Sequence, residues 1–471
     1  MKIISLLLLT CSAHLLICQN SVTIHGRIGN LPSGKIYIRY VKDYMTYDQV
    51  VPDSAATNES GEFSMSFPWN KPWPVFFIAG EQSTDLYLAP GDNLEIKADE
   101  NNFDSTIHYS GKGSAVNNYL AQKALHGSYS QRTKISASKH KNEKEFTVFI
   151  DSCYKDNMNF FRKSFAGSTD PGEIAYMNTE EKDLNYLWIN DKLRYPGYHR
   201  YFNDLKDFEV SDQYYDFLKD VDLDDPKSIA SHLYIECLDL YIVNKLSGEQ
   251  KMDSTLKDPD NYSAAKDRFI LKHFTGEVQT MLTAMEAYDL IVHQNNTTLG
   301  KQVMERYNSH SKDKTYSGIL NDVYSLAAKL APGNPAPEFT FPDQNGKSIS
   351  LKDFKGKIVY LDVWASWCGP CLKEVPYAKT LEEEMKSKDI VFLYVSVDDD
   401  ENAWKKKIAE KEIAGIHLIS KGGFESQIAK SYNIKSIPRY IIIGKDGKII
   451  NSFAKRPSGK VKEDLDKLVD R

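Results

Sequence analysis

Residues 364–371 read WASWCGPC, and this stretch decides how the last third of the chain folds. The residues before it, 357–364, are rich in Ile, Val, Tyr and Leu and predict a buried β-strand. After it, apolar residues recur at helical spacing from Leu372 to Met385 and predict an amphipathic helix. Cys368 is therefore expected at a helix N-terminus, where unpaired N–H groups and the helix dipole favour a thiolate. This pattern indicates thiol–disulfide exchange.

A Cys-x-x-Cys pair can also supply half of a zinc site. A structural zinc ion would need a second cysteine pair or a histidine pair at ligand spacing. The other four cysteines are isolated, and the nearest downstream histidine, His417, stands alone in an apolar run. We therefore expect no metal and no other cofactor, and the redox group is the Cys368–Cys371 pair itself.

Length and composition bound the remaining possibilities. At 471 residues the chain is too long for one ordinary core, which predicts two to four domains. The 41% hydrophobic and 26% charged residues are typical of a soluble globular protein. A net charge of -6 gives no reason to expect nucleic acid as a partner.

Residues 1–18 are predicted to be an export signal. Lys2 precedes an apolar run that is too short, and too broken by polar residues, to be a good membrane-spanning helix. Cleavage before Gln19 would give a soluble protein and is favoured. The alternative is a lipid anchor, because LLIC at residues 15–18 resembles a bacterial lipoprotein box with Cys18 as the lipidated residue. The membrane is expected as a partner only through that anchor.

Three segments follow the signal, so the chain is expected to be a multidomain α+β protein. Residues 19–112 carry short alternating runs separated by turns, which predict an antiparallel β-sandwich or barrel-like module. Its strands are expected at residues 22–28, 35–41, 62–67, 75–79, 85–88 and 93–97. Residues 113–330 change to a helical period, clearest at residues 143–165, 228–246 and 277–293, and predict an α-helical region.

Two cysteines lie in this helical region. Cys153 and Cys237 have apolar helical surroundings, where a buried inert thiol is the commonest outcome. A disulfide between them stays open as an alternative.

The Pro-rich sequence APGNPAP at residues 331–337 marks the last domain boundary. Beyond it, strands and helices alternate, which predicts a sheet covered on both faces. Strands are expected at residues 357–364, 390–397, 416–419, 440–443 and 448–453. Helices are expected at residues 371–385, 401–412, 425–431 and 458–469.

Residues 331–471 resemble the thioredoxin superfamily, and within it the TlpA/ResA-like thiol-disulfide oxidoreductases of the bacterial cell envelope. The resemblance rests on APEF at 336–339, DQNGK at 343–347, KGK at 355–357, the WASWCGPC stretch, SIP at 436–438 and IGKDGKI at 443–449. It implies an α/β thioredoxin fold for this segment. The β module and the helices resemble the N-terminal region often fused to such domains, whose function is not defined.

The resemblance also implies a division of roles among site residues. Cys368, expected to be the more exposed thiol, attacks a substrate disulfide, and Cys371 resolves the mixed disulfide. Asp362 and Glu374 match two carboxylates of the family, and either could take the proton from Cys371. Burial raises the pKa of a carboxyl group and so makes it a better general base.

Five further residues are implied to bind the substrate chain. Pro438 matches the cis-proline that faces the cysteines, with Ile437 presenting backbone groups, and Trp367, Gly369 and Pro370 surround the first thiol. The next residue, Arg439, departs from the small or hydroxylic residue usual there. It could bias the groove toward acidic partners or be a solvated strand end. Pro376 is expected to kink the active-site helix without ending it.

The resemblance implies an exported enzyme that reduces protein disulfides in the periplasm or cell envelope. Gly369-Pro370 is the pair found in reducing thioredoxins, so a membrane thiol donor is expected to recharge it. A disulfide donor or isomerase of the same fold is the alternative, as is a binding module (residues 19–330) with an accessory redox domain. A peroxiredoxin is disfavoured, because Leu361 and Ala365 replace the residues of its peroxide-reducing motif.

Overall fold

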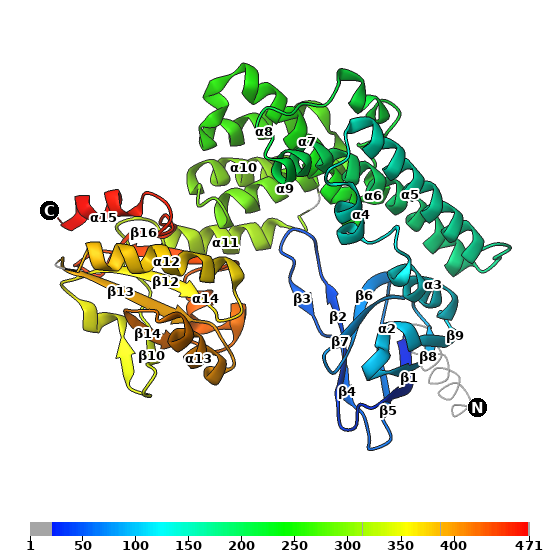
Figure 1. The fold of residues 1–471 in the computed structure, drawn as a ribbon, viewed down its shortest axis with the longest axis horizontal. Coiled ribbons are helices and arrows are strands. Elements are labelled where there is room, and N and C mark those ends of the chain that lie inside the picture. Colours follow the sequence, from blue (N-terminus) through cyan, green and yellow to red (C-terminus); the bar gives the residue numbers. More distant parts are fainter. Residues whose placement is uncertain (1–20, 313, 387, 470–471) are drawn as a thin grey trace, which may run out of the picture. The chain divides into compact units, whose positions relative to one another are not determined.

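A computed structural model describes residues 21–312, 314–386 and 388–469, so the expected export signal and Cys18 lie outside the described residues. The chain divides into two compact units, Met1–Ser254 and Thr255–Arg471 (Figure 1). The linker predicted at residue 331 lies inside the second unit. Leu330, at the end of the preceding helix, packs into the core of the C-terminal domain.

The first unit begins with two β-sheets. Their strands are β1 (Ser21–Gly29), β2 (Lys35–Val41), β3 (Gln49–Val50), β4 (Ser54–Ala56), β5 (Glu62–Pro68), β6 (Trp73–Ala79), β7 (Gln82–Leu88), β8 (Asn93–Asp99) and β9 (His108–Lys112). One sheet has the order β5-β1-β8-β9, and the other has the order β3-β2-β6-β7 with β4 also paired to β2.

The two sheets share one hydrophobic core, to which β1, β2, β5, β6, β7 and β8 contribute. Strand β5 shows the reason, since Phe63, Met65 and Phe67 are buried while the residues between them are exposed. This arrangement confirms the predicted sandwich. One pair departs from the prediction: β1 runs parallel to β8, so that sheet is mixed. Alternation of apolar residues does not record strand direction, so the sequence could not show this.

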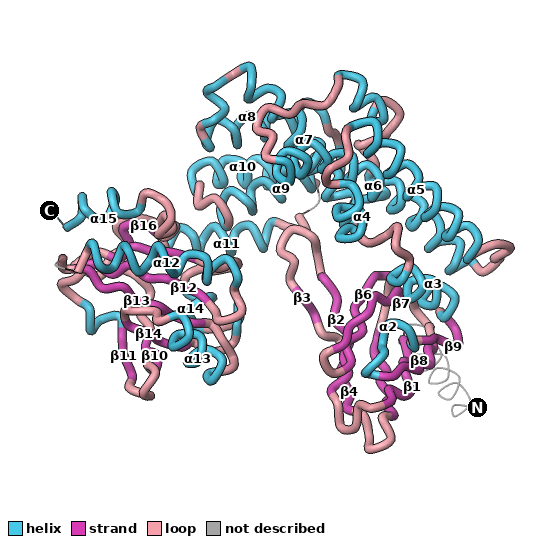
Figure 2. Tube along the Cα trace, in the orientation of Figure 1, coloured by secondary structure: helices cyan, strands magenta, loops and turns pink. Residues whose placement is uncertain are grey.

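Helices make up the rest of the first unit (Figure 2). They are α2 (Phe103–Thr106), α3 (Ser114–Leu125), α4 (Gln131–Ser138), α5 (Glu143–Ser164), α6 (Pro171–Asn203) and α7 (His232–Met252), with short 3-10 helices at Glu100–Asn102, Asp212–Leu218 and Pro226–Ser228. Asn142 and Glu145 form a capping box at the start of α5. Asp170 caps α6, whose first residue is Pro171.

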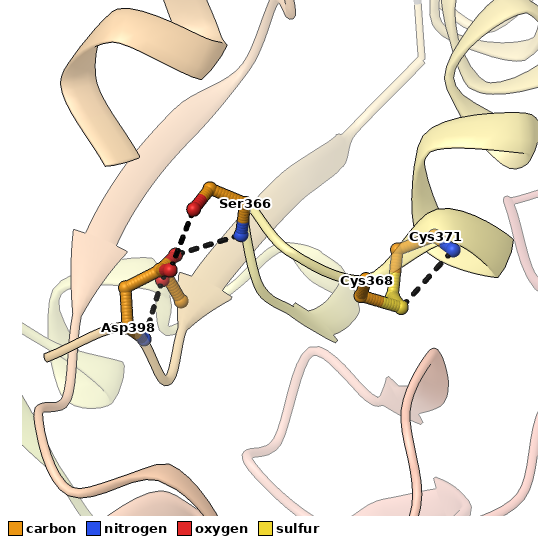
Figure 3. The surroundings of a disulfide bond; sticks show 5 residues. Ser366, Cys368, Cys371 and Asp398 are labelled. Carbon is orange, nitrogen blue, oxygen red and sulfur yellow. Dashed lines mark hydrogen bonds between the residues drawn. A yellow bond between two sulfur atoms is a disulfide. The ribbon is translucent and has the colours of Figure 1, made fainter. Parts of the chain in front are cut away.

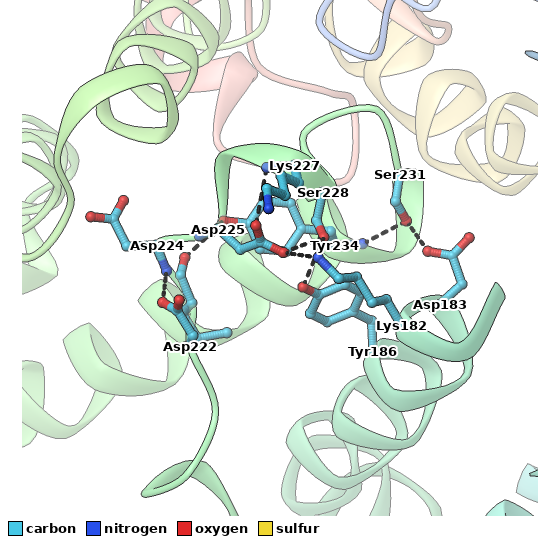
Figure 4. Close-up of polar contacts among 11 residues, drawn as sticks. Lys182, Asp183, Tyr186, Asp222, Asp224, Asp225, Lys227, Ser228, Ser231 and Tyr234 are labelled. Carbon is cyan, nitrogen blue, oxygen red and sulfur yellow. Dashed lines mark hydrogen bonds and ion pairs between the residues drawn. The ribbon is translucent and has the colours of Figure 1, made fainter. Parts of the chain in front are cut away.

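A polar network joins α6 to the segment that precedes α7 (Figure 4). Asp225 accepts hydrogen bonds from Lys182 Nζ at 2.5 Å and from Ser228 Oγ at 2.7 Å. Tyr186, on α6, reaches Ser228 Oγ through its hydroxyl at 3.1 Å. Because these polar groups satisfy one another, the connection can pack against the helix without unpaired donors or acceptors.

The two cysteines of the helical region are not joined to each other. Cys153 is partly buried and Cys237 is buried, and both are free thiols among the described cysteines. Burial raises the pKa of Cys237 to about 12 and also raises that of Cys153. Both thiols are therefore protonated near neutral pH, as expected for inert cysteines.

The second unit starts with four helices, α8 (Pro259–His273), α9 (Gly276–Val292), α10 (Thr297–His310) and α11 (Ser317–Lys329), after a 3-10 helix at Ser254–Lys257. The strands of its C-terminal domain are β10 (Thr340–Pro342), β11 (Ser348–Ser350), β12 (Ile358–Trp364), β13 (Ile390–Ser396), β14 (Ile416–Ile419), β15 (Arg439–Ile443) and β16 (Ile449–Asn451). Its helices are α12 (Gly369–Glu384), α13 (Glu401–Lys411), α14 (Gln427–Ser431) and α15 (Val461–Val469), with 3-10 helices at Leu351–Phe354 and Gly423–Glu425.

Five of these strands form one sheet in the order β14-β13-β12-β15-β16. Strand β12 is central and buried at every residue, and it pairs in parallel with β13 and antiparallel with β15. Helices α12 and α15 cover one face through Leu381 and Leu465, while α13 and α14 cover the other through Trp404 and Ile428. This is the predicted sheet with both faces covered. Within the described part of the chain, no helix is long and apolar enough to cross a membrane.

Candidate active site

The Cys-x-x-Cys pair lies where β12 passes into α12. Cys368 is the N-cap of α12, and its Sγ accepts a hydrogen bond from the backbone N–H of Cys371 at 3.1 Å. The two cysteines are joined as a disulfide, with their Cα atoms 5.3 Å apart. When the disulfide is reduced, the same N–H and the helix dipole would stabilise negative charge on Cys368.

The two cysteines are equally buried, which differs from the expectation that Cys368 is the more exposed. Each keeps 4% of its surface accessible, and both belong to the core of the domain. The adjacent Gly369 and Pro370 are exposed, and Trp367 is 59% exposed. The accessible surface next to the disulfide therefore comes from its neighbours in sequence.

Asp362 lies on β12, six residues before Cys368, and is buried. Its Oδ1 has no hydrogen-bond partner among the described residues. Its pKa is raised to about 8, mainly because the group is buried; the Tyr440 hydroxyl opposes this shift, and the carboxylates of Glu374 and Glu382 add to it. Such a group exchanges its proton near neutral pH, as a general base requires.

Glu374 lies one helical turn beyond Cys371 and is buried, with 7% of its surface accessible. Both of its carboxylate oxygens are hydrogen-bonded to Ser458: Oε2 accepts from the backbone N–H at 3.0 Å and Oε1 from the hydroxyl at 2.9 Å. Glu374 is therefore not a solvated helix residue. Ser458 was not predicted from the sequence, since it lies 84 residues away in the segment before α15.

The Ile437–Pro438 peptide bond is cis, and both residues are partly exposed. Helix α12 continues through Pro376, so this proline does not end the helix, as expected. Arg439 is 6% exposed, so the interpretation as a solvated strand end is wrong. Its guanidinium carbon lies 3.8 Å from the centre of the Phe453 ring, and burial lowers its pKa to about 10.

The buried carboxylate of Asp398, two residues after the end of β13, binds the turn before Cys368 (Figure 3). Asp398 accepts hydrogen bonds from the backbone N–H of Ser366 at 2.8 Å, from the Ser366 hydroxyl at 2.7 Å and from the Ser396 hydroxyl at 2.6 Å. Asp398 was not predicted from the sequence. The signal was present, because residues that follow neighbouring parallel strands meet at one edge of the sheet.

In the described residues, no group of three or more His, Cys, Asp or Glu side chains could hold a metal ion. His417 is buried in β14, where its Nε2 lies 2.8 Å from the carbonyl oxygen of Ala414. This ring nitrogen of His417 therefore faces backbone carbonyl oxygens.

These features define a thioredoxin-fold redox protein. The Redoxin family model matches residues 331–469. The ResA thiol-disulfide oxidoreductase of Bacillus cereus is 36% identical over 135 residues, which are 29% of this chain and 76% of that protein. The ResA of Bacillus subtilis is 30% identical over 132 residues, which are 28% of this chain and 72% of that protein. The chain belongs to the ResA family of thiol-disulfide oxidoreductases and is an enzyme of that activity.

Solved structures also resemble this part of the chain. A putative thiol-disulfide oxidoreductase from Bacteroides vulgatus is 38% identical, with a TM-score of 0.28, and the match covers 30% of this chain and 99% of that one. A thiol-disulfide oxidoreductase from Bacteroides fragilis is 30% identical, with a TM-score of 0.26, over 28% of this chain and 98% of that one.

Proposed function

We propose that the protein is exported and reduces protein disulfides in the bacterial cell envelope, with Cys368 as nucleophile and Cys371 as resolving thiol. The observation that carries the proposal is the position of Cys368 as N-cap of α12, with its Sγ accepting the Cys371 N–H. This geometry favours a thiolate at the first cysteine and leaves the second to be deprotonated later.

The reaction has two exchange steps. The Cys368 thiolate attacks one sulfur of the substrate disulfide, forms a mixed disulfide and expels the other substrate sulfur as a thiolate, which takes a proton from water. Cys371 then transfers its proton to the Asp362 carboxylate, and its thiolate attacks Cys368 Sγ. The second substrate thiolate leaves, the substrate has gained two electrons, and the enzyme holds the Cys368–Cys371 disulfide.

A further turnover needs a thiol donor that reduces this disulfide. We assign that role to a membrane thiol protein on the same side of the membrane. No other cofactor takes part, since the two cysteines carry both electrons. Trp367, Gly369, Pro370, Ile437 and Pro438 are the residues that we expect to touch the substrate chain.

The reduction potential of the Cys368–Cys371 couple tests the direction of the reaction. We expect a value near that of reducing thioredoxins, about -270 mV, measured by equilibration with glutathione or dithiothreitol. A value near about -120 mV, as in strong oxidants, would overturn the reductase proposal in favour of a disulfide donor.

Two cysteine variants test the assigned roles. Cys368→Ala should abolish reduction of insulin disulfides, and activity close to wild type would refute this nucleophile. Cys371→Ala should accumulate mixed disulfides with its substrates, which names them directly after affinity purification and mass spectrometry. The free thiols Cys153 and Cys237 provide the matched control, because Cys153→Ala should leave insulin reduction unchanged.

Export and anchoring need a separate experiment. Cell fractionation should place the chain in the envelope, and recovery from the cytoplasm alone would contradict export. Labelling with an alkyne fatty acid distinguishes the two processing routes. Label that disappears in Cys18→Ser indicates a lipid anchor, whereas an unlabelled chain beginning at Gln19 indicates simple cleavage.

A further inference from the structure

Two large aromatic side chains are exposed beside the disulfide. Trp367 precedes Cys368 and is 59% exposed, and Phe424, from the short 3-10 helix before α14, is 40% exposed. Their ring centroids are 6.4 Å apart at an interplanar angle of 71°, an edge-to-face contact. Each ring therefore covers only part of the other and leaves apolar surface facing solvent.

The loops that contain Trp367 and Phe424 are both hydrogen-bonded to the same turn, which contains Asp398 and Asp399. Asp398 binds the backbone and hydroxyl of Ser366, the residue before Trp367. The next residue, Asp399, accepts a hydrogen bond from the backbone N–H of Gly422 at 2.8 Å, two residues before Phe424. The Asp398 carboxylate thus holds the backbone before Trp367, and the Asp399 carboxylate holds the backbone before Phe424.

The loop of Phe424 has a backbone that specifies its conformation. Gly422 has a φ of +115°, which side chains other than glycine rarely adopt, and Gly423 has a φ of +57°. The N–H of Gly423 also donates to the carbonyl oxygen of Val397 at 3.0 Å. A loop held in this way loses little conformational entropy when a ligand binds to it.

We propose that Trp367 and Phe424 together form a recognition surface for an apolar side chain next to the cysteine that Cys368 attacks. The occupant is the substrate polypeptide, because the surface is continuous with the disulfide through the Trp367–Cys368 peptide bond. Exposed, rigidly held aromatic residues are typical of the centres of protein-binding surfaces. This inference rests on the proposed function, and it adds Phe424 as a specificity-determining residue that contacts substrate.

The test compares two substrates and two variants of the full chain. The substrates are peptides with one intramolecular disulfide that differ only in the residue beside the attacked cysteine, Leu in one and Gln in the other. Phe424→Ala should lower kcat/KM for the Leu peptide roughly tenfold, equivalent to about 1.4 kcal/mol, mainly through KM. The Gln peptide should change by less than about twofold, and the reduction potential should stay that of the wild type.

Tyr377 supplies the matched control. It is also a large aromatic residue, 54% exposed, on α12 of the same domain. Tyr377→Ala should leave kcat/KM for both peptides unchanged. Phe424→Trp, which keeps an aromatic ring at this position, should keep the wild-type preference for the Leu peptide.

Each other outcome has a definite meaning. Equal losses for both peptides, or no loss, would overturn the role of Phe424, as would a shifted reduction potential in Phe424→Ala. A surface that instead joins two copies of the chain would show as self-association that Phe424→Ala abolishes, and this would also overturn the inference. If the wild type reduces neither peptide nor insulin, the proposed function itself fails, which is a different result.

Discussion

Ser458 binds both carboxylate oxygens of Glu374, through its backbone N–H at 3.0 Å and its hydroxyl at 2.9 Å. The pair joins the active-site helix α12 to the segment that leads into α15. Ser458→Ala removes the hydroxyl donor from a carboxylate that is only 7% exposed. We expect the free energy of unfolding of the second unit to fall by about 1 kcal/mol in urea denaturation.

Ser348 on β11 is the control for this change, since it is an exposed serine of the same domain. Ser348→Ala should change the free energy of unfolding by less than about 0.5 kcal/mol. Equal effects of the two substitutions would mean that the Ser458 hydroxyl contributes nothing specific to Glu374.

The raised pKa of Asp362 makes stability depend on pH. Burial raises this pKa from 3.8 to about 8, so between these values the native chain holds a proton that the unfolded chain releases. The stabilisation is complete below about pH 4 and is lost as the pH rises through 8. Asp362→Asn should therefore raise the free energy of unfolding at pH 8.5 by several kcal/mol, since one pKa unit corresponds to about 1.4 kcal/mol, and change it little at pH 4.

Chemical denaturation at the two pH values measures this difference. The exposed Asp389, at the start of β13, provides the control, because Asp389→Asn should give the same small effect at both. A variant Asp362→Asn that is no more stable than wild type at pH 8.5 would show that Asp362 ionises freely in the folded protein.

Glu374 should set the pH at which Asp362 can act as a base. Its carboxylate is among the groups that raise the pKa of Asp362, so Glu374→Gln lowers that pKa. We expect the rate of resolution of the mixed disulfide to rise with pH at a lower midpoint in Glu374→Gln than in the wild type. Glu383 is the control on the same helix, since its side chain is 75% exposed and pairs with Lys386. An unchanged midpoint in Glu374→Gln would contradict electrostatic coupling between the two carboxylates.

The sequence predicted the helices and strands in which apolar residues recur at a clear helical or strand spacing. The strand at 35–41 has the bounds of β2, and the buried run at 357–364 became β12 with one residue fewer. The strands it missed are β3, β4, β10 and β11, with two or three residues each, and β9, with five. Segments of two or three residues carry too few positions for alternation to be seen, and in β9 only Tyr109 is buried.

The site residues that lie close together in the sequence could be predicted. Cys368, Cys371 and Asp362 lie within ten residues of one another and share one strand-to-helix unit. Ser458 and Phe424 reach the site only because the sheet brings distant loops together, and nothing in their local sequence indicates this. For Arg439 the sequence left two interpretations open, and the one as a solvated strand end is wrong because the ring of Phe453, just after β16, covers the guanidinium.

The first unit contains a buried carboxylate whose loss should be costly. Glu180 on α6 is 3% exposed and accepts hydrogen bonds from Tyr119 at 2.7 Å, Tyr176 at 2.9 Å and Lys123 at 2.6 Å. Glu180→Ala would remove the acceptor that these three donors share, and we expect it to cost about 3 kcal/mol in the free energy of unfolding.

The adjacent Glu181 makes a matched comparison, because it pairs with Arg162 at 3.1 Å while 53% of its side chain is exposed. Exposed ion pairs contribute little, so Glu181→Ala should cost less than about 1 kcal/mol. Hydrogen exchange in peptides from α3 and α6 would locate the loss, with faster exchange in both helices for Glu180→Ala and not for Glu181→Ala. Similar exchange in the two variants would mean that the tyrosine and lysine donors find water when Glu180 is removed, and that the cluster does not hold α3 against α6.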